Sequence, residues 1–488
     1  MNATMQHAND ERVRLTMDGR ECVARVGETI LNVARRHGIE IPTLCHHDGY
    51  RPDGNCRACV VEIDGERTLA PSCCRAVQPD MRVHTRSARA LKSQRLVVEM
   101  LLADLPEQGH RWIDDDPKRG HGELSRWADA LGVTPRPALT ALRRAAPAGD
   151  ASHPAIAVNL DACIQCTRCV RACREEQVND VIGFARRGEQ AKIVFDLDDA
   201  LGESTCVACG ECVQACPTGA LMPATRLGSQ AVDREVASVC PYCGVGCQIT
   251  YKIKQERIVA VDGLNGPANH GRLCVKGRFG FDYVHHPHRL TQPLIRKPGV
   301  AKNPNDAPKP DAWSNVFRTA TWDEALDLAA HKLRTLRETH GPKSLAGFGS
   351  AKGSNEEAYL FQKLVRTGFG SNNVDHCTRL CHASSVAALL EGVGSGAVSN
   401  QVNDVEHADF IFIIGSNPTS NHPVAATWFK NAAKRGTKIV LADPRRTDIA
   451  KHAWRVLQFK ADTDVALLNA MIHTIIDEHL VDAAFLNQ

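Results

Sequence analysis

The chain has 488 residues, of which 43% are hydrophobic and 24% charged, and its formal net charge is +3 at pH 7. This composition is that of a globular protein, and so small a charge does not favour nucleic acid or an anionic membrane surface as a partner. No run of about 20 apolar residues predicts a transmembrane helix, and the N-terminus has no apolar signal region, so we expect a cytoplasmic protein. Cysteine is unusual: there are 20, and the reducing cytosol favours metal binding over disulfides.

The first group of cysteines lies in a predicted domain over residues 1–85. Alternating residues in ERVRLTMDG and ECVARV predict a hairpin, TILNVARRHGI predicts a helix and ACVVEI a strand. This order is typical of a β-grasp ferredoxin. A C-x10-C-x2-C-x13-C spacing indicates a [2Fe–2S] cluster, whereas the alternative, a zinc site, usually has two C-x2-C pairs. The predicted ligands are Cys45, Cys56, Cys59 and Cys73.

Residues 86–150 contain no cysteine, and their pattern predicts helices followed by a linker. The predicted domain over residues 151–232 contains the most specific cysteine pattern of the chain. CIQCTRCVRAC and CVACGECVQACP are both C-x2-C-x2-C-x3-C, as in bacterial two-cluster ferredoxins, where the fourth cysteine of each run ligates the other cluster. One [4Fe–4S] cluster is therefore predicted on Cys163, Cys166, Cys169 and Cys216. The second is predicted on Cys206, Cys209, Cys212 and Cys173.

A third [4Fe–4S] cluster is predicted in the domain over residues 233–295, from CPYCGVGC and the later GRLCVKGRFG. Lys276 follows two residues after the last ligand, and its position alone favours an ordinary surface lysine. The predicted ligands are Cys240, Cys243, Cys247 and Cys274.

Residues 296–488 predict part of an α/β domain. Apolar strands such as DFIFIIGSN, predicted to be buried, alternate with amphipathic helices, which argues for an open parallel sheet with ligands at the carboxyl ends of its strands. Those ends suit a nucleotide-like cofactor, because small residues let phosphate approach and Arg can bind it, although ordinary turn chemistry is the alternative. The candidate residues are Gly415, Ser416, Asn417, Pro418, Asp443, Arg445 and Arg446.

Almost the whole chain resembles the N-terminal half of the large subunit of cytosolic NAD-dependent formate dehydrogenases, which contain molybdenum or tungsten. The resemblance rests on the order of sixteen cysteines and on CVKG, NNVDHCTRLCH, GSNPTSNHPV and DPRRT. The N-terminal third is also similar to the large iron–sulfur subunit of complex I and to a small subunit of NAD-linked hydrogenases. Together these features imply a multidomain α+β and α/β protein that ends in truncated molybdopterin-oxidoreductase domains.

The resemblance implies reversible oxidation of formate to CO2 at a bis-molybdopterin guanine dinucleotide centre with molybdenum or tungsten. Cys381 would be the protein ligand of this metal, His382 would assist it, and Lys276 would lie between the proximal cluster and the pterin. Cys377 falls on a position that is not a ligand. Electrons would pass to a partner iron–sulfur subunit that binds FMN and NAD, in a hetero-oligomer without nucleic acid or membrane.

The sequence departs from these relatives in two ways. The region LPEQGHRWIDDDPKRGHGELSRW has His110 and His121 but no cysteine, so we expect no further cluster there. The family's large subunit also continues past residue 488 and carries a substrate-binding arginine in that part. An alternative function is a non-catalytic electron-transfer subunit of a complex I- or hydrogenase-like assembly. Another is a related enzyme such as a nitrate reductase, against which Cys381-His382 argues.

Overall fold

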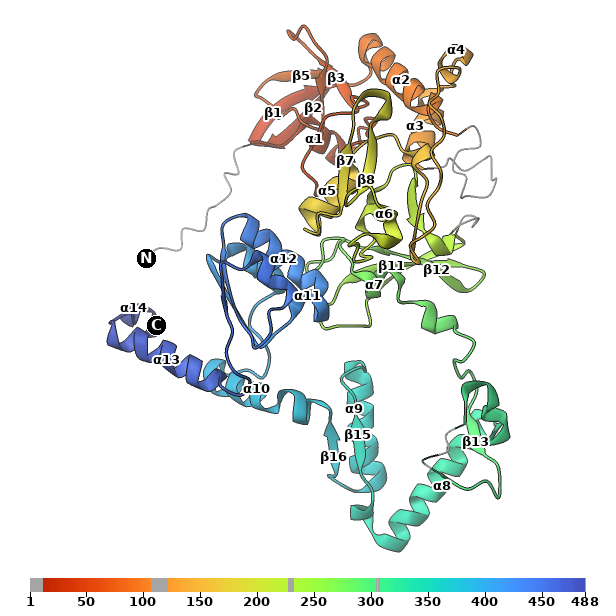
Figure 1. Cartoon of the computed structure of the whole chain (residues 1–488), viewed down its shortest axis with the longest axis vertical. Coiled ribbons are helices and arrows are strands. Elements are labelled where there is room, and N and C mark those ends of the chain that lie inside the picture. Colours follow the sequence, from red (N-terminus) through yellow and green to blue (C-terminus); the bar gives the residue numbers. More distant parts are fainter. Residues whose placement is uncertain (1–11, 107–121, 227–231, 304, 306–307, 488) are drawn as a thin grey trace. The chain divides into compact units, whose positions relative to one another are not determined.

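A computed structural model describes residues 12–106, 122–226, 232–303, 305 and 308–487 (Figure 1). The chain divides into two compact units, Met1–Phe281 with Val402–Gln488 and Asp282–Gln401. Within the described ranges, no helix is both long and apolar enough to cross a membrane. His110 and His121 lie outside these ranges, so the expectation about a cluster near them stays a prediction.

The first unit begins with a five-stranded sheet in the order β2-β1-β5-β3-β4. β1 runs parallel to β5, and the other pairs are antiparallel. Alternate residues of β1 are buried, so one face of the strand forms the core. The bounds are β1 Arg12–Met17, β2 Arg20–Arg25, α1 Ile30–Arg36, β3 Val60–Ile63, β4 Ala70–Pro71, β5 Met81–His84, α2 Ala88–Ala103, α3 Glu123–Leu131 and α4 Pro137–Thr140.

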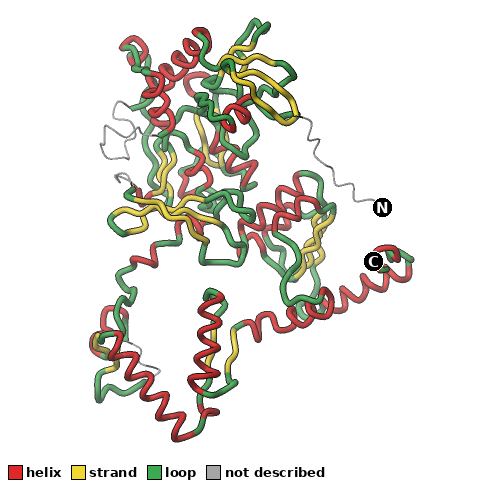
Figure 2. The backbone as a smooth tube through the Cα atoms, turned by 180° about the vertical axis from the view of Figure 1, so that it is seen from behind, coloured by secondary structure: helices red, strands yellow, loops and turns green. Residues whose placement is uncertain are grey.

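The next segment consists of short helices and strands joined by loops (Figure 2), and the cysteine runs lie partly in these loops and partly in its short helical elements. β6 pairs with β9, β7 with β8, and β10-β11-β12 form an antiparallel sheet. The bounds are β6 Ile156–Val158, η1 Leu160–Ala162, α5 Arg168–Arg171, η2 Ala172–Glu176, β7 Ile182–Ala185, η3 Gly188–Gln190, β8 Lys192–Phe195, η4 Leu201–Glu203, α6 Glu211–Ala215, β9 Leu221–Pro223, η5 Ala224–Arg226, β10 Arg234–Val239, β11 Gln248–Lys254, β12 Arg257–Gly263 and α7 Val275–Phe279.

The last part of the first unit contains the parallel sheet β17-β18-β19. Helix α12 attaches it to the preceding segment, since the indole N–H of Trp428 donates to the carbonyl of Ala268 at 2.8 Å. The bounds are η10 Val402–His407, β17 Phe410–Ile414, α11 Pro418–Asn421, α12 Pro423–Lys434, β18 Lys438–Ala442, η11 Asp448–His452, β19 Arg455–Leu457, α13 Asp464–Asp477 and α14 Ala483–Leu486.

The prediction that residues 409–417 form a buried strand is wrong in one respect. In β17 only Ile411 and Ile413 are buried, and the residues between and beside them are partly or fully exposed. Side chains alternate between the two faces of a strand, so a continuous apolar run is fully buried only where both faces are covered.

The second unit, residues 282–401, consists mainly of helices with two small sheets. β13 pairs with β14 in antiparallel orientation and β15 with β16 in parallel orientation. Helices α8, α9 and α10 contain no buried residue. The bounds are η6 Asp282–His285, β13 Leu294–Arg296, η7 Pro310–Asn315, β14 Phe317–Thr319, α8 Trp322–His340, η8 Pro342–Ser344, β15 Gly347–Gly349, α9 Asn355–Lys363, η9 Leu364–Phe369, β16 Val374–His376 and α10 Thr378–Val393.

Candidate functional sites

The four predicted ligand cysteines of the N-terminal domain, Cys45, Cys56, Cys59 and Cys73, lie together in the loops around β3 and β4. The backbone N–H of Cys45 donates to the sulfur of Cys56 at 3.4 Å. Hydrogen bonds from Cys56 and Cys73 lower the pKa of the Cys45 thiol to about 2. A hydrogen bond from Cys73 lowers the pKa of Cys59 to about 7. The same hydrogen bonds raise the pKa values of Cys56 and Cys73, so the four thiols are in mutual contact, and this grouping fits a small iron–sulfur cluster.

One cavity in the ferredoxin-like segment is lined by cysteines from both runs: Cys163, Cys166 and Cys169 from the first and Cys216 from the second. The other lining residues are mostly apolar, including Leu160 and Ile193. Burial raises the pKa of Cys163 to about 11 and that of Cys166 to about 12. A cationic iron core would offset this cost by stabilising the thiolates, so the donor set fits a [4Fe–4S] cluster.

Cys173 from the first run lies with the remaining cysteines of the second run. Burial raises the pKa of Cys209 to about 12, and the charges of Cys173 and Cys206 raise it further. Burial and the charges of Cys209, Cys169, Cys206 and Cys173 also raise the pKa of Cys212. Cys216 and Cys173 thus each lie near cysteines of the other run, and the crossed assignment of cluster ligands stays a prediction.

A second cavity is lined by the remaining cysteine set, Cys240, Cys243, Cys247 and Cys274. Lys276, near the start of α7, lines the same cavity and is otherwise exposed. Asn421 at the end of α11 and Pro423 and Val424 at the start of α12 also line this cavity. Four thiols in one cavity again fit a [4Fe–4S] cluster, with an ammonium group at its border.

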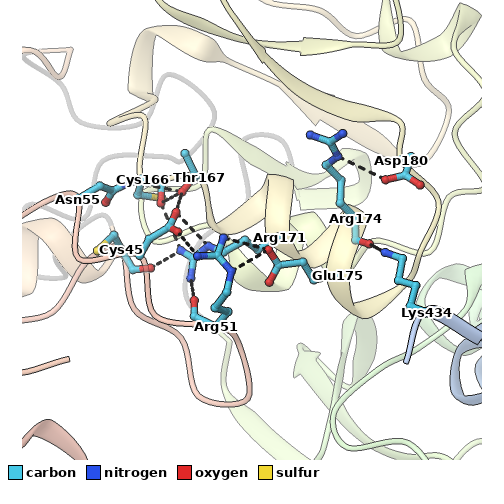
Figure 3. Close-up of polar contacts among 11 residues, drawn as sticks. Cys45, Arg51, Asn55, Cys166, Thr167, Arg171, Arg174, Glu175, Asp180 and Lys434 are labelled. Atoms are coloured by element: carbon cyan, nitrogen blue, oxygen red, sulfur yellow. Dashed lines mark hydrogen bonds and ion pairs between the residues drawn. The ribbon is translucent and has the colours of Figure 1, made fainter. Parts of the chain in front are cut away.

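Arg171 joins the first two cysteine sites, and the sequence analysis does not single it out (Figure 3). Its buried guanidinium donates to the carbonyl oxygens of Cys45 and Cys166, and to that of Arg51 at 2.6 Å. Thr167 adds a second link, since its hydroxyl donates to Asp53 at 2.7 Å. The only sequence signal is the position of this arginine inside the run CTRCVRAC.

Arg278 joins the last two cysteine sites in a similar way. Its Nε donates to the carbonyl of Cys209 at 2.9 Å, and its Nη2 lies 3.5 Å from the carboxylate of Glu211. Arg278 is only 1% exposed. Gly210 makes room for it: its φ is +68°, and a Cβ at this position would lie 2.1 Å from Cδ of Arg278. Arg171 thus links the first site to the second, and Arg278, whose backbone N–H donates to the carbonyl of Cys274, links the third site to the fourth.

The two predicted cofactor-binding loops meet at the carboxyl edge of the parallel sheet. The N–H of Gly415 donates to the carbonyl of Ala442 at 2.9 Å, and a carboxylate oxygen of Asp443 accepts from the N–H of Arg445 at 2.8 Å. Arg445 and Arg446 are exposed at this edge. Nearby, the buried hydroxyl of Thr447 lacks a hydrogen-bond partner among the described residues. Exposed guanidinium groups beside an unsatisfied hydroxyl suit a phosphate-bearing ligand.

Cys381 and His382 lie in the first turns of α10, and both side chains are exposed. The N–H of Cys381 donates to the carbonyl of Cys377 at 3.2 Å. These residues belong to the second unit, whereas Lys276 and the loops at the parallel sheet belong to the first.

The second unit also contains a cavity that the sequence analysis does not single out. It lies where β15 and β16 end, close to the start of α10, and is lined by Ser350, Lys352, Glu357 and His376 among others. The glycines and serines of GSAKGS, directly after β15, are its only sequence signal.

Comparison with protein families finds four matching segments in the chain. Residues 10–88 match a 2Fe-2S iron-sulfur cluster binding domain, and residues 153–222 match the ferredoxin-like domain of NADH-quinone oxidoreductase subunit 3. Residues 233–286 match the molybdopterin oxidoreductase Fe4S4 domain, and residues 289–486 match molybdopterin oxidoreductase. The predicted combination of 2Fe–2S, 4Fe–4S and molybdopterin domains is confirmed.

Curated relatives align with nearly the whole chain. "Probable oxidoreductase YjgC" of Bacillus subtilis is 32% identical over 97% of the chain, and a Staphylococcus aureus protein named "Putative formate dehydrogenase" is 31% identical over 98%. The chain covers 50% of the length of each. Among solved structures, an NAD+-reducing [NiFe]-hydrogenase matches with 27% identity and a TM-score of 0.40, over 46% of this chain and 92% of the other.

Proposed function

We propose that this molybdopterin oxidoreductase chain takes part in the oxidation of formate to CO2, with Cys381 as the protein ligand of a molybdenum or tungsten centre. The observation that carries the proposal is the pair Cys381-His382 at the start of α10, within the segment that matches molybdopterin oxidoreductase. Relatives named as formate dehydrogenases align over nearly the whole chain.

The cofactor in this proposal is bis-molybdopterin guanine dinucleotide, which when bound supplies the two-electron chemistry. Arg445 and Arg446 would bind its phosphates. Gly415 has no side chain, so the phosphates could approach the backbone there. The thiolate of Cys381 would bind the metal, and His382 would accept or hold the proton released from formate, because imidazole titrates near neutral pH. Lys276 would lie between the pterin and the cluster of Cys240.

The four cysteine sets would bind one [2Fe–2S] and three [4Fe–4S] clusters and carry the electrons away from the pterin. Direct links through Arg278 and Arg171 support this order, which ends at the β-grasp domain. We further propose a cytoplasmic hetero-oligomer in which a flavin-containing iron–sulfur subunit reduces NAD. The match to an NADH-quinone oxidoreductase subunit supports a multi-subunit assembly. A purely electron-transferring subunit is less favoured, because residues 289–486 match molybdopterin oxidoreductase.

The test replaces Cys381 by Ala in the full-length enzyme, with Cys377→Ala as the matched control four residues away. Cys381→Ala should abolish formate-dependent dye reduction and leave the EPR signals of the clusters unchanged, whereas Cys377→Ala should keep most activity. The reverse result would assign the metal to Cys377. Metal analysis separates the alternatives: molybdenum or tungsten supports the enzyme, and iron alone supports an electron-transfer subunit.

A further inference from the structure

Lys430 is a buried lysine in α12, and its side chain reaches a loop of the ferredoxin-like segment. The residue is 8% exposed. Its ammonium group donates to the carbonyl of Gln177, to that of Val178 at 3.4 Å and to the side-chain oxygen of Asn179 at 3.1 Å. This loop follows Cys173, so a residue of the molybdopterin segment contacts the surroundings of a cluster ligand.

The residues around Lys430 accept hydrogen bonds from its ammonium group, but none of the described ones forms an ion pair with it. Among the described residues, no carboxylate lies within ion-pair distance of its Nζ, and all three acceptors are neutral. An unpaired charge is costly to bury. Burial lowers the pKa of Lys430 to about 8, while the negative charges of Cys209 and Cys173 oppose that shift.

Asn179 connects the ammonium group to the cysteines. Its amide oxygen accepts from Lys430, and its amide nitrogen lies 4.0 Å from the sulfur of Cys209. The negative charges that act on the lysine are those of Cys209 and Cys173, followed by that of Asp180. The first two belong to the cysteine set Cys173, Cys206, Cys209 and Cys212.

We propose that Lys430 is a positioning residue that keeps a positive charge beside this [4Fe–4S] cluster and thereby raises its reduction potential. The inference rests on the proposed ligand set. Reduction adds an electron to a cluster that four thiolates already make negative, and a fixed cation in a medium of low dielectric stabilises the reduced state. The alternative is that Lys430 only ties α12 to the loop.

The experiment is a redox titration of the holoprotein followed by EPR. Lys430→Gln keeps a hydrogen-bond donor but removes the charge, Lys430→Met removes both, and Lys430→Arg keeps the charge. Lys434→Met is the matched control, because Lys434 lies one turn later, is exposed and donates to the carbonyl of Arg174 (Figure 3).

Lys430→Gln and Lys430→Met should raise the ratio of oxidised to reduced cluster about tenfold at the wild-type midpoint, a shift of about 59 mV for one electron. Lys430→Arg and Lys434→Met should stay close to the wild type, and the [2Fe–2S] cluster should not respond.

An unchanged potential in Lys430→Gln would overturn the proposal, and so would an equal shift in Lys430→Arg, because either result indicates a purely structural role. Iron analysis and the EPR signals of the wild type test the ligand set separately: absence of this [4Fe–4S] signal would remove the proposed cluster itself.

Discussion

The region around the cysteine sites and residues 282–401 differ in how their side chains are buried. In the first, Cys45, Cys173 and Cys212 are all less than 10% exposed, and buried guanidinium groups bind the backbone beside the ligands. In the second, the three long helices bury no residue, and Leu380, directly before Cys381, is 97% exposed.

This difference shows how two kinds of site are built. A cluster is held by closely spaced cysteines in a few loops, so its surroundings form within one compact segment. A large organic cofactor is held by the ends of several elements, so its site depends on surfaces that are distant in sequence. The helix that carries Cys381 lies within residues 282–401, but this unit alone leaves the side chain of Cys381 exposed.

The largest expected effect is the loss of a cluster on removing one crossed ligand. Wild-type protein with all clusters should contain about 14 iron atoms per chain, and Cys216→Ser should contain about 10. The EPR signal that disappears should be the one also lost in Cys163→Ser. Cys74→Ser is the control, because this exposed cysteine lies 3.6 Å from the sulfur of Cys73 but outside the ligand set. Loss of the signal shared with Cys206→Ser would contradict the crossed assignment.

Gly210→Ala should lower stability by about 3 kcal/mol, because its Cβ would overlap Arg278 in a buried region and its φ is positive. Gly132→Ala is the matched control: its φ is +62° but no atom lies within 4 Å of the added Cβ, so only about 1 kcal/mol of backbone strain is expected. The apparent midpoint of thermal unfolding measures both. Equal shifts would show that Arg278 can move away.

Arg171→Leu should lower the free energy of unfolding by about 2 kcal/mol, because it leaves the carbonyl oxygens of Cys45 and Cys166 without their donor. Arg174→Leu should lower the free energy of unfolding by less than about 1 kcal/mol, since Arg174 is exposed and its ion pair with Asp180 spans 3.3 Å at the surface. Thermal unfolding of the two variants compares them directly. Similar losses would mean that the link between the two cysteine sites contributes little.

The smallest effect is expected in the second unit. Leu380→Ala should change stability by less than about 0.5 kcal/mol, whereas the same change at the fully buried Leu44 should cost about 2–5 kcal/mol. Urea unfolding of residues 1–488 provides the measurement. A large loss in Leu380→Ala would show that this helix surface is packed and would remove the contrast between the two regions.

The cysteine runs are visible in the sequence alone, because cluster ligands recur at short spacings within a run. That the four sets hold clusters stays a prediction. The sequence also predicted the hairpin after Arg12 and the parallel strands that end at Gly415 and Asp443, because hydrophobic period and turn residues are local signals. The metal-ligand role of Cys381 came from a resemblance and stays a proposal.

Only the tertiary structure decided which charged side chains are buried beside the clusters. In the sequence, Arg171 is one residue of a cysteine run and Lys430 is one residue of a predicted helix. Their roles depend on contacts with residues more than a hundred positions away. Likewise, the apolar run of β17 did not reveal that one face is less covered. Burial depends on which elements pack together, and that choice is made by long-range contacts that leave no periodic signal in the chain.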